Sequence, residues 1–453
     1  MRPRLPGASG GSAPRVVAGL PFRFGLAALA ARIGPRRDPG AEGGSLACAR
    51  VAPSRCRSPG SPAVDERCRW IPHRGGRLRA RRDTNGSEFL QLGRHPSLSR
   101  RLWDYSGVTS VGIVGAGRAA TLHAESVRAA RGVRLAGVAA RSTASPRAAA
   151  LADALDCPVL TAQELARTCD VAVIATPPAA RAEALAELAS SRRLRAVLVE
   201  SPAATSIDGI AELGAAFGGR PVMAAVNLLH APAVRQMLDV VAAMDPHHLE
   251  LRLAVPDPAR GAGAGRSFGG GVTIDPAAGF WPVLVAAMGA AVRSVAAPRL
   301  EVSDGLDHAA ELVLTAANGR TARAQLRWGA RVAEAAVEAA DPAHVARVDV
   351  WPVPIVEIDG ASTGSAADPA HTVASRRGGS AHPLAALGFT AQIERLVRVG
   401  SGDAQPWPDL AVASSALTIA AAASLSAKSN GISVDVSDVP RDLSPFELAS
   451  TGC

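Results

Sequence analysis

The hexapeptide "GAGRAA", residues 115–120, has the spacing of a turn that binds phosphate groups. It follows the apolar run "VGIV", and small residues at its first, third and sixth positions are typical of the strand-to-helix turn of dinucleotide-binding proteins. Gly115 allows the tight turn, Gly117 lets the backbone approach a pyrophosphate, and Ala120 lets the helix pack closely on the strand. The first turn of that helix offers N–H groups to the anion. We therefore predict a dinucleotide site, with a merely structural glycine turn as the alternative.

The end of the next predicted strand bears on which dinucleotide binds. An Asp or Glu there accepts hydrogen bonds from the ribose 2′-hydroxyl and favours NAD. This chain has "AARS", residues 139–142, at that point. The missing carboxylate removes a repulsion, and Arg141 can pair with a 2′-phosphate. We therefore expect NADP rather than NAD, with an ordinary solvated arginine as the alternative for Arg141.

The stretch "VLVESPAAT", residues 197–205, indicates a buried strand that stops at Glu200-Ser201-Pro202. In open parallel sheets the ligand crevice lies just beyond such strand ends. Ser201 brings a neutral hydroxyl to that place, and a hydroxyl cannot supply a positive charge to a reacting oxygen. The only lysine of the chain, Lys428, is distant in sequence.

Three side chains are candidates for catalysis: His230 and Arg235 in "NLLHAPAVR", and Asp275 in "DPAAGFWP". An imidazole titrates near neutral pH and can act as a general acid or base. His230 follows a predicted strand by three residues and could face the crevice, whereas a packing or surface role is the alternative. His308 is a further candidate.

The formal net charge of +9 is concentrated at one end of the chain. Residues 1–107 hold 20 Arg and 7 acidic residues, whereas residues 108–453 hold 29 basic and 33 acidic residues. The body of the chain is thus slightly acidic, and we expect no nucleic-acid partner. Residues 1–107 are rich in Gly, Pro, Ser and Arg, without a helix or strand period. We interpret them as disordered or as upstream DNA translated in frame before a start near Val108, rather than as a transit peptide, a nucleic-acid tail or a secretory signal.

The six cysteines show no C-x-x-C pair, so we predict neither a metal site nor a disulfide framework. Reduced thiols favour a cytoplasmic location. The Ala-rich stretch 411–427 is interpreted as too short and too weakly apolar to span a membrane. We therefore expect a cytoplasmic protein with no membrane partner.

From residue 110 onward, short apolar runs alternate with amphipathic helical segments. Apolar runs without alternation are typical of buried parallel strands, and strands alternating with helices indicate a doubly wound sheet. The predicted strands are 111–115, 134–140, 171–176, 196–200 and 221–227. We therefore predict an α/β fold whose first domain, residues 108–228, is a dinucleotide-binding Rossmann domain.

Past Asn227 the pattern changes. A helix over 231–243 and the strand "HLELRLAV" precede the Gly-rich loop 258–271, a helix over 280–288, and alternating runs on either side of Asn318-Gly319, a pair that favours a hairpin turn. The pattern predicts an α+β domain with a mostly antiparallel open sheet over residues 229–440. A tail, residues 441–453, follows.

Several of these stretches together resemble the Gfo/Idh/MocA oxidoreductases. They are "GIVGAGRAATLHAESV", "VAVIATPPAAR", "VESPAAT", Asn227 after the last strand of the first domain, and "GGGVTID" before a helix, and the similarity covers Val108 to about Val436. The resemblance implies a Rossmann domain, a C-terminal domain whose sheet often forms an oligomer interface, and oxidation or reduction of sugars, cyclitols and related hydroxy compounds through nicotinamide. It implies cofactor contacts by Gly115, Gly117, Arg118, Ala119, Arg141, Thr176, Pro177, Pro178, Glu200 and Asn227.

The chain departs from the family at both positions that carry the chemistry. The fifth strand of the family usually ends Glu-Lys-Pro, and Ser201 replaces the Lys. In the family motif Asp-x-Gly-x-His-x-x-Asp, Asp275 remains, while Gly279 and Pro282 replace the His and the second Asp. Arg181 stands where many relatives have His. Two hypotheses follow: an NAD(P)-dependent oxidoreductase for a small hydroxy or carbonyl compound with a rebuilt active site, or a non-catalytic NADP-binding sensor or partner subunit. For either we expect a small-molecule ligand and a homo-oligomer.

Overall fold

The computed structural model describes residues 108–256, 270–303, 305–351, 354–363 and 383–448. These residues belong to one unit of the chain, Leu92–Cys453. The basic segment 1–107, most of the Gly-rich loop and the last residues of the tail lie outside the described residues. The expectations stated for those segments therefore stay predictions.

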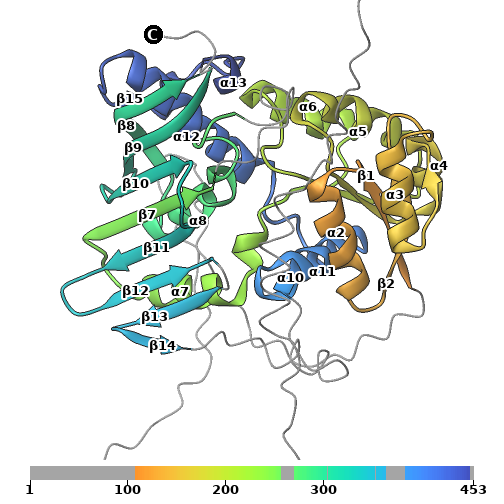
Figure 1. Ribbon diagram of the computed structural model, residues 1–453, viewed down its shortest axis with the longest axis horizontal. Coiled ribbons are helices and arrows are strands. Elements are labelled where there is room, and N and C mark those ends of the chain that lie inside the picture. The colour runs from red at the N-terminus through yellow and green to blue at the C-terminus, as the bar shows by residue number, and fades with distance from the viewer. Residues whose placement is uncertain (1–107, 257–269, 304, 352–353, 364–382, 449–453) are drawn as a thin grey trace, which may run out of the picture. The chain divides into compact units, whose positions relative to one another are not determined.

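The first sheet has six parallel strands in the order β3-β2-β1-β4-β5-β6. The strands are β1 (Thr109–Val114), β2 (Val133–Ala139), β3 (Val159–Leu160), β4 (Val171–Ile174), β5 (Ala196–Val199) and β6 (Val222–Ala224). Every residue of β4 and β5 is buried, which is why their sequences are apolar without alternation. The strand order reverses between β1 and β4, as in a doubly wound Rossmann domain, so the predicted fold of this half is confirmed. Figure 1 shows this half on the right, with β1 and β2 labelled.

Helices cover both faces of the first sheet. They are α2 (Arg118–Ala129), α3 (Pro146–Leu155), α4 (Ala162–Thr168), α5 (Arg181–Ala189), α6 (Ile207–Ala216) and, from far along the chain, α11 (Phe389–Gly400). Ile393 of α11 packs in the same buried cluster as Val111 of β1 and Leu198 of β5. A segment inside the range predicted for the second domain thus completes the core of the first.

The second sheet has nine strands in the order β14-β13-β12-β11-β7-β10-β9-β8-β15. They are β7 (His248–Val255), β8 (Val292–Ser303), β9 (Leu306–Ala316), β10 (Thr321–Trp328), β11 (Glu334–Ala340), β12 (Val345–Asp349), β13 (Ile355–Ile358), β14 (Ala361–Thr363) and β15 (Val434–Asp435). β7 and β10 run parallel, and the other neighbouring strands pair antiparallel. The prediction of a mostly antiparallel second sheet is confirmed, as is the turn at Asn318-Gly319, which joins β9 to β10.

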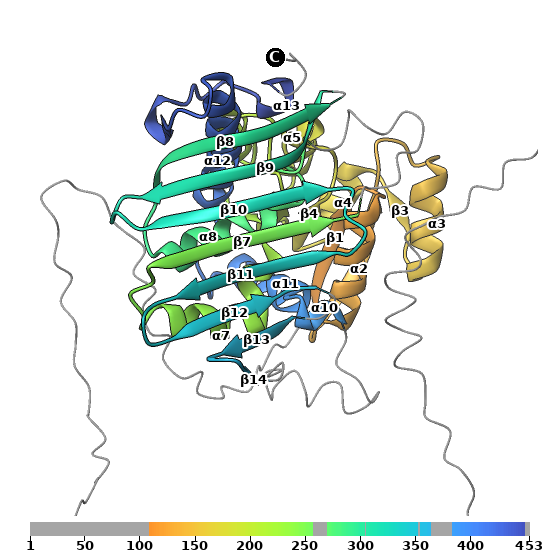
Figure 2. The same cartoon turned by 60° about the vertical axis from the view of Figure 1, so that its left-hand side comes forward.

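One face of the second sheet packs against helices, and the other carries charged side chains. The covering helices are α7 (Pro232–Val241), α8 (Trp281–Met288) and α12 (Leu410–Lys428), which lie behind the sheet in Figure 2. In β10, Ala324 and Leu326 are buried on the helix side, whereas Arg323 and Arg327 are exposed on the other. This alternation is expected of an antiparallel sheet with one solvated face.

Helix α12 corrects one expectation from the sequence. Within the described part of the chain it is the one helix long and apolar enough to cross a membrane, with a mean hydropathy of 1.7 over 18 residues. The stretch was therefore wrongly judged too short and too weakly apolar. However, 56% of that window is buried, and α12 packs against β8, α6 and α8. These contacts are those of a core helix.

The remaining elements are short. They are α10 (Pro383–Ala386), α13 (Pro445–Leu448) and the 3-10 turns η1 (Pro178–Ala180), η2 (Asn227–His230), η3 (Ala277–Gly279) and η4 (Val436–Asp438). Two of these turns matter for the site, because η2 follows β6 and η3 follows the loop that carries Asp275.

Candidate active site

The glycine-spaced turn between β1 and α2 has the backbone geometry that its sequence predicts. Gly115 has a φ of +120°, and a Cβ atom there would lie 2.7 Å from the carbonyl oxygen of Ala175. Only glycine tolerates both that conformation and that approach. At Gly117, by contrast, no atom of the other described residues, apart from its two chain neighbours, lies within 4 Å of the Cβ position, so the space in front of the helix is open to a ligand.

The N-terminus of α2 carries no capping side chain. Gly117 is its N-cap residue, and the first turn contains no acidic side chain. Helices α3 and α6 differ, because Ser145 and Ser206 accept hydrogen bonds from their first-turn amides. The amides of α2 are therefore available to an anion, and the side chain of Arg118 beside them is exposed.

Other predicted cofactor residues lie at the ends of the neighbouring strands. Arg141 is exposed two residues beyond β2. Thr176 and Pro177 follow β4, and the Thr176 Oγ1 atom is buried without a hydrogen-bond partner among the described residues. A ligand hydroxyl or phosphate oxygen would satisfy that atom.

Glu200, directly after β5, forms a close pair with His123 of α2. The distance from Nε2 of His123 to Oε2 of Glu200 is 2.6 Å, and the His123 side chain is completely buried. Burial by itself would raise the pKa of Glu200, but His123, the amide of Ser201 and Arg181 together hold it below the ordinary value. Glu200 is therefore a fixed anion at the strand end.

Arg181 ties the ends of β4 and β5 together. Its guanidinium donates to the carbonyl oxygen of Thr176 at 2.9 Å and to those of Glu200 and Pro202. Burial lowers the pKa of Arg181 to about 10, with the charge of Glu200 acting in the opposite direction. The arginine thus replaces backbone hydrogen bonds that the parallel strands cannot make beyond their last residues.

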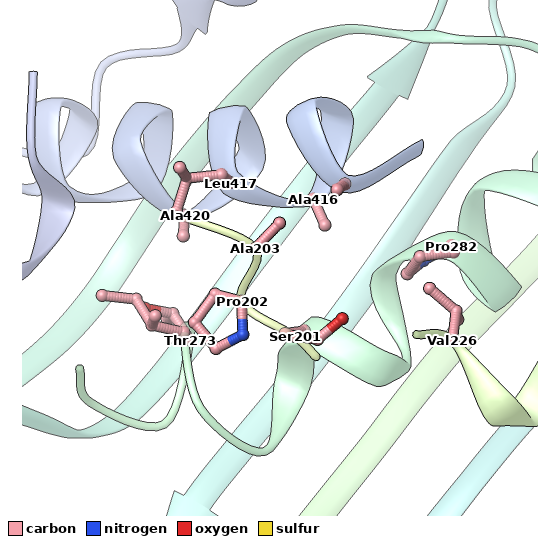
Figure 3. Close-up of a pocket in the computed structure, with 12 residues that line it drawn as sticks. Ser201, Pro202, Ala203, Val226, Thr273, Pro282, Ala416, Leu417 and Ala420 are labelled. Carbon is pink, nitrogen blue, oxygen red and sulfur yellow. The ribbon is translucent and has the colours of Figure 1, made fainter. Parts of the chain in front are cut away.

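Ser201, at the position of the family lysine, is already engaged. Its hydroxyl donates to the carbonyl oxygen of Ala225 at 2.8 Å. Ser201 and Thr273 also line a cavity of about 10 Å³, whose other walls include small apolar side chains of α12 (Figure 3). A volume of that size holds roughly one water molecule. Ser201 therefore anchors the strand end and brings no charge to the site.

Asp275 lies where charges from both domains act on it. Asp275 is exposed, yet desolvation by the surrounding protein raises its pKa, and Glu200 raises it further, whereas Arg118 lowers it. The charges of two other predicted residues, Arg118 and Glu200, thus act on Asp275. Among the described residues other than its chain neighbours, none has an atom within 4 Å of the Cβ position of Gly279 in η3, so the position that aligns with the histidine of the family motif is open.

The structure places the other catalytic candidates elsewhere. The His230 ring packs edge-on against Trp407 at 5.3 Å and is buried, and burial with the nearby charges of Arg235 and Arg395 lowers its pKa to about 3. A buried ring with so low a pKa is a weak base that does not hold a proton near pH 7, so we assign it no proton-transfer role. Arg235 is exposed on α7.

Two further candidates also have contacts within the protein. The side-chain amide of Asn227 donates to the carbonyl oxygen of Leu387 at 2.9 Å, and its cofactor contact stays a prediction. His308 packs edge-on against the ring of Trp328 at 5.9 Å.

The sequence analysis did not identify His123 as a site residue, although its position in the helix pattern indicates burial. It shares the buried face of α2 with Ala120, Ala124 and Val127, where a histidine needs a polar partner. The described residues contain no group of three or more His, Cys, Asp or Glu that could hold a metal ion.

Comparison with known proteins agrees with this geometry. Residues 109–228 match the model of the Gfo/Idh/MocA oxidoreductase family, NAD-binding Rossmann fold. No curated protein sequence matches the chain. Similar solved structures include GenD2 from gentamicin A biosynthesis in complex with NAD, at 19% identity over 73% of this chain and 96% of that chain, with a TM-score of 0.59.

Two further structures share the fold. UDP-N-acetylglucosamine 3-dehydrogenase from Acidithiobacillus ferrooxidans is 19% identical over 69% of this chain and 95% of that chain, with a TM-score of 0.56. An oxidoreductase from Agrobacterium radiobacter in complex with NAD+, L-tartaric acid and magnesium is 16% identical over 73% and 99%, with a TM-score of 0.58. Residues 109–228 therefore match the NAD-binding Rossmann domain of the Gfo/Idh/MocA oxidoreductase family, and the chain shares the fold of these solved structures.

Proposed function

We propose that the protein is an NAD(P)-dependent oxidoreductase that interconverts a hydroxyl and a carbonyl group on a small, sugar- or cyclitol-like compound. The observation that carries this proposal is the uncapped N-terminus of α2 behind the Gly115 turn, with open space at Gly117. The family match of the same residues supports it.

The residues present fit a nicotinamide dinucleotide. The amides of the first turn of α2 and the Arg118 side chain would hold the pyrophosphate, and Thr176 with Pro177 would line the crevice beyond β4. Because no carboxylate follows β2 and Arg141 is exposed there, we propose NADP as the preferred cofactor. When bound, the nicotinamide supplies the hydride acceptor or donor.

Asp275 is the group that we assign to proton transfer. Two carboxyl groups whose surroundings move their pKa values apart divide the acid–base roles between them. Glu200 has the lowered pKa and stays charged, whereas Asp275 has the raised pKa. Asp275 would accept the proton of the substrate hydroxyl during oxidation and return it during reduction. His230 and Arg235 are not needed for this step.

A second candidate function is favoured by Ser201. Its hydroxyl is bound to Ala225, and neither Ser201 nor Gly279 offers the charge or the titratable group of the family motif. The alternative is therefore a non-catalytic NADP-binding sensor or partner subunit.

A single-turnover experiment separates the two functions. Purified protein is mixed with NADPH and a panel of keto-sugars and small aldehydes, and NADPH oxidation is followed by absorbance, with binding followed by NADPH fluorescence. Turnover with any substrate, lost in Asp275→Asn, supports the oxidoreductase. Intact binding without turnover on the whole panel supports the sensor.

We also propose a cytoplasmic homo-oligomer in which the open face of the second sheet takes part. That face carries a shallow basin of about 280 Å³ lined by both arginine and glutamate side chains, among them Arg252, Arg327 and Glu311. Mixed charge of this kind allows two copies of one face to complement each other. Light scattering coupled to gel filtration would measure the assembly.

A further inference from the structure

A buried carboxyl group lies directly beneath the loop that carries Asp275. Asp307, near the start of β9, is 3% exposed. Burial raises its pKa, although its hydrogen bonds to Thr273 and the charge of His308 act in the opposite direction. Its Oδ1 atom is buried without a hydrogen-bond partner among the described residues. Burying such a group costs free energy unless its hydrogen bonds compensate for the lost water.

A bulge in β9 turns Asp307 to the buried side of the sheet. Glu301 of β8 pairs with Ala309, but the next residue, Val302, pairs with Asp307, so His308 is an extra residue in the ladder. Side chains alternate between faces along a strand, and one extra residue therefore moves every residue beyond it to the opposite face. Without the bulge, Asp307 would share the charged open face with Glu311.

On that buried side, Asp307 holds two consecutive amides of the loop. Its Oδ2 atom accepts a hydrogen bond from the Thr273 amide at 2.9 Å, and its carbonyl oxygen accepts one from the Val272 amide at 2.8 Å. Trp281 of α8 holds the same loop from the other side, because its Nε1 donates to the carbonyl oxygen of Thr273 at 2.8 Å. The amide of Asp275 then closes the turn on the carbonyl oxygen of Gly271 at 3.0 Å.

Gly271 is required by the same contact. A Cβ atom at this position would lie 1.2 Å from Oδ1 of Asp307, and Gly271 is itself buried. Asp307 and Gly271 therefore fit only together, and the buried carboxyl sets the path of the backbone four residues before Asp275.

We propose that Asp307 is a positioning residue that fixes the loop 271–275 and thereby holds the Asp275 carboxyl at the active site. The catalytic consequence of this role rests on the proposed proton transfer by Asp275. The restraint on the loop stands independently of it.

The test compares the full-length wild-type chain with Asp307→Ala, Asp307→Asn and Gly271→Ala. Asparagine keeps an acceptor for the Thr273 amide, whereas alanine removes it. Glu250→Ala is the matched control, because Glu250 is a 5% exposed carboxylate of the same sheet whose partners are Arg252 and His248. The readouts are hydrogen exchange of the amides 272–275, kcat, the KM for NADPH and the pH profile of kcat.

We expect Asp307→Ala and Gly271→Ala to speed exchange of the loop amides about fivefold or more, since a protecting hydrogen bond is lost. A displacement of Asp275 by about 1 Å should lower kcat on the order of 10²-fold and shift its pH profile, with the KM for NADPH unchanged. Asp307→Asn should stay close to wild type in all four readouts. Gly271→Ala and Asp307→Asn carry the test if Asp307→Ala does not fold.

Wild-type exchange of the loop amides in folded Asp307→Ala or Gly271→Ala would overturn the proposal, as would an equal effect in Glu250→Ala. If the wild-type chain has no turnover, the proposed proton transfer fails, and exchange alone still decides whether Asp307 holds the loop. If the wild-type enzyme is active, the expected faster exchange of the loop amides in Asp307→Ala or Gly271→Ala without any change in kcat would overturn the catalytic consequence.

Discussion

On one side of the candidate site the backbone sets the geometry, and on the other side single side chains set it. At the first sheet, Gly115, the open position at Gly117 and the uncapped α2 follow from the strand-to-helix turn. At the loop 271–275, the position of Asp275 depends on Asp307 and Trp281, which come from other elements. The sequence resembles the Gfo/Idh/MocA pattern on the first side and departs from that pattern at Ser201, Gly279 and Pro282 on the second.

This difference has a physical reason. A dinucleotide is recognised largely by main-chain N–H groups and by close approach, which demand small residues at fixed spacing. Proton transfer demands only that one titratable group of suitable pKa lie near the reacting atom, and several positions can supply it. The second side can therefore change while the first is kept.

The largest expected effect is that of Asp275→Asn, which tests the chemical side directly. If Asp275 transfers the proton, kcat should fall by about 10²- to 10⁴-fold, while NADPH affinity stays the same. Desolvation and the charge of Glu200 raise the pKa of Asp275 above its ordinary value of 3.8. Oxidation needs the ionised form, so its rate should fall with decreasing pH at a pH above 3.8, and the variant should lose this decline.

Asp239→Asn, an exposed acid-to-amide change on α7, is the control and should behave as wild type. A full rate in Asp275→Asn would show that the chemistry does not depend on the one carboxylate that the family motif retains here.

The next effect in size belongs to the cofactor side. In Gly115→Ala, the added Cβ meets Ala175 at 2.7 Å in a backbone conformation with φ of +120°. Strain of roughly 1–3 kcal/mol should weaken dinucleotide binding about 10- to 100-fold, as measured by NADPH fluorescence titration. Gly132→Ala is the matched control, because Gly132 also has a positive φ, +67°, but in the described part of the chain no residue beyond its neighbours has an atom within 4 Å of its Cβ position. Equal losses in both variants would mean that the turn is only structural.

The sequence predicted the features that depend on local backbone patterns. It did not predict the contacts that depend on strand register or on residues far apart in the chain. The parallel order of the first sheet and the glycine turn follow from apolar runs and from fixed local spacing. The pairing of His123 with Glu200 joins residues 77 positions apart, and the position of Asp307 depends on a single bulge in β9. Neither has a local pattern. His230 had the right residue type at a strand end, but burial beside Trp407 decides its state.

The pH dependence of the free energy of unfolding tests whether the His230 ring is buried or is accessible for catalysis. Its pKa in the folded protein is about 3, against an ordinary value of 6.5. As pH falls from 6.5 towards 3, the unfolded chain takes up a proton at this ring and the folded chain does not, so the free energy of unfolding decreases. His230→Phe should remove this contribution and make the dependence shallower by up to about 1.4 kcal/mol per pH unit.

Chemical denaturation between pH 4 and pH 7 measures the slope. His344→Phe is the control, since Asp359 raises the pKa of that exposed ring and the sign of its contribution is opposite. An unchanged slope in His230→Phe would mean that the ring is accessible and titrates, which would return it to the candidates for catalysis.

The smallest expected effect concerns Arg141, at the edge of the cofactor side. The side chain is exposed beyond β2, so a contact with a 2′-phosphate would be screened by solvent and salt. We expect Arg141→Ala to weaken NADPH binding by no more than about fivefold and to leave NADH binding unchanged, with the difference shrinking as ionic strength rises. Arg134→Ala is the control, because Arg134 is also exposed but lies near the opposite end of the same strand. A loss of the same size for NADH, or in Arg134→Ala, would mean that Arg141 adds only general positive charge and that the α2 amides bind both cofactors alike.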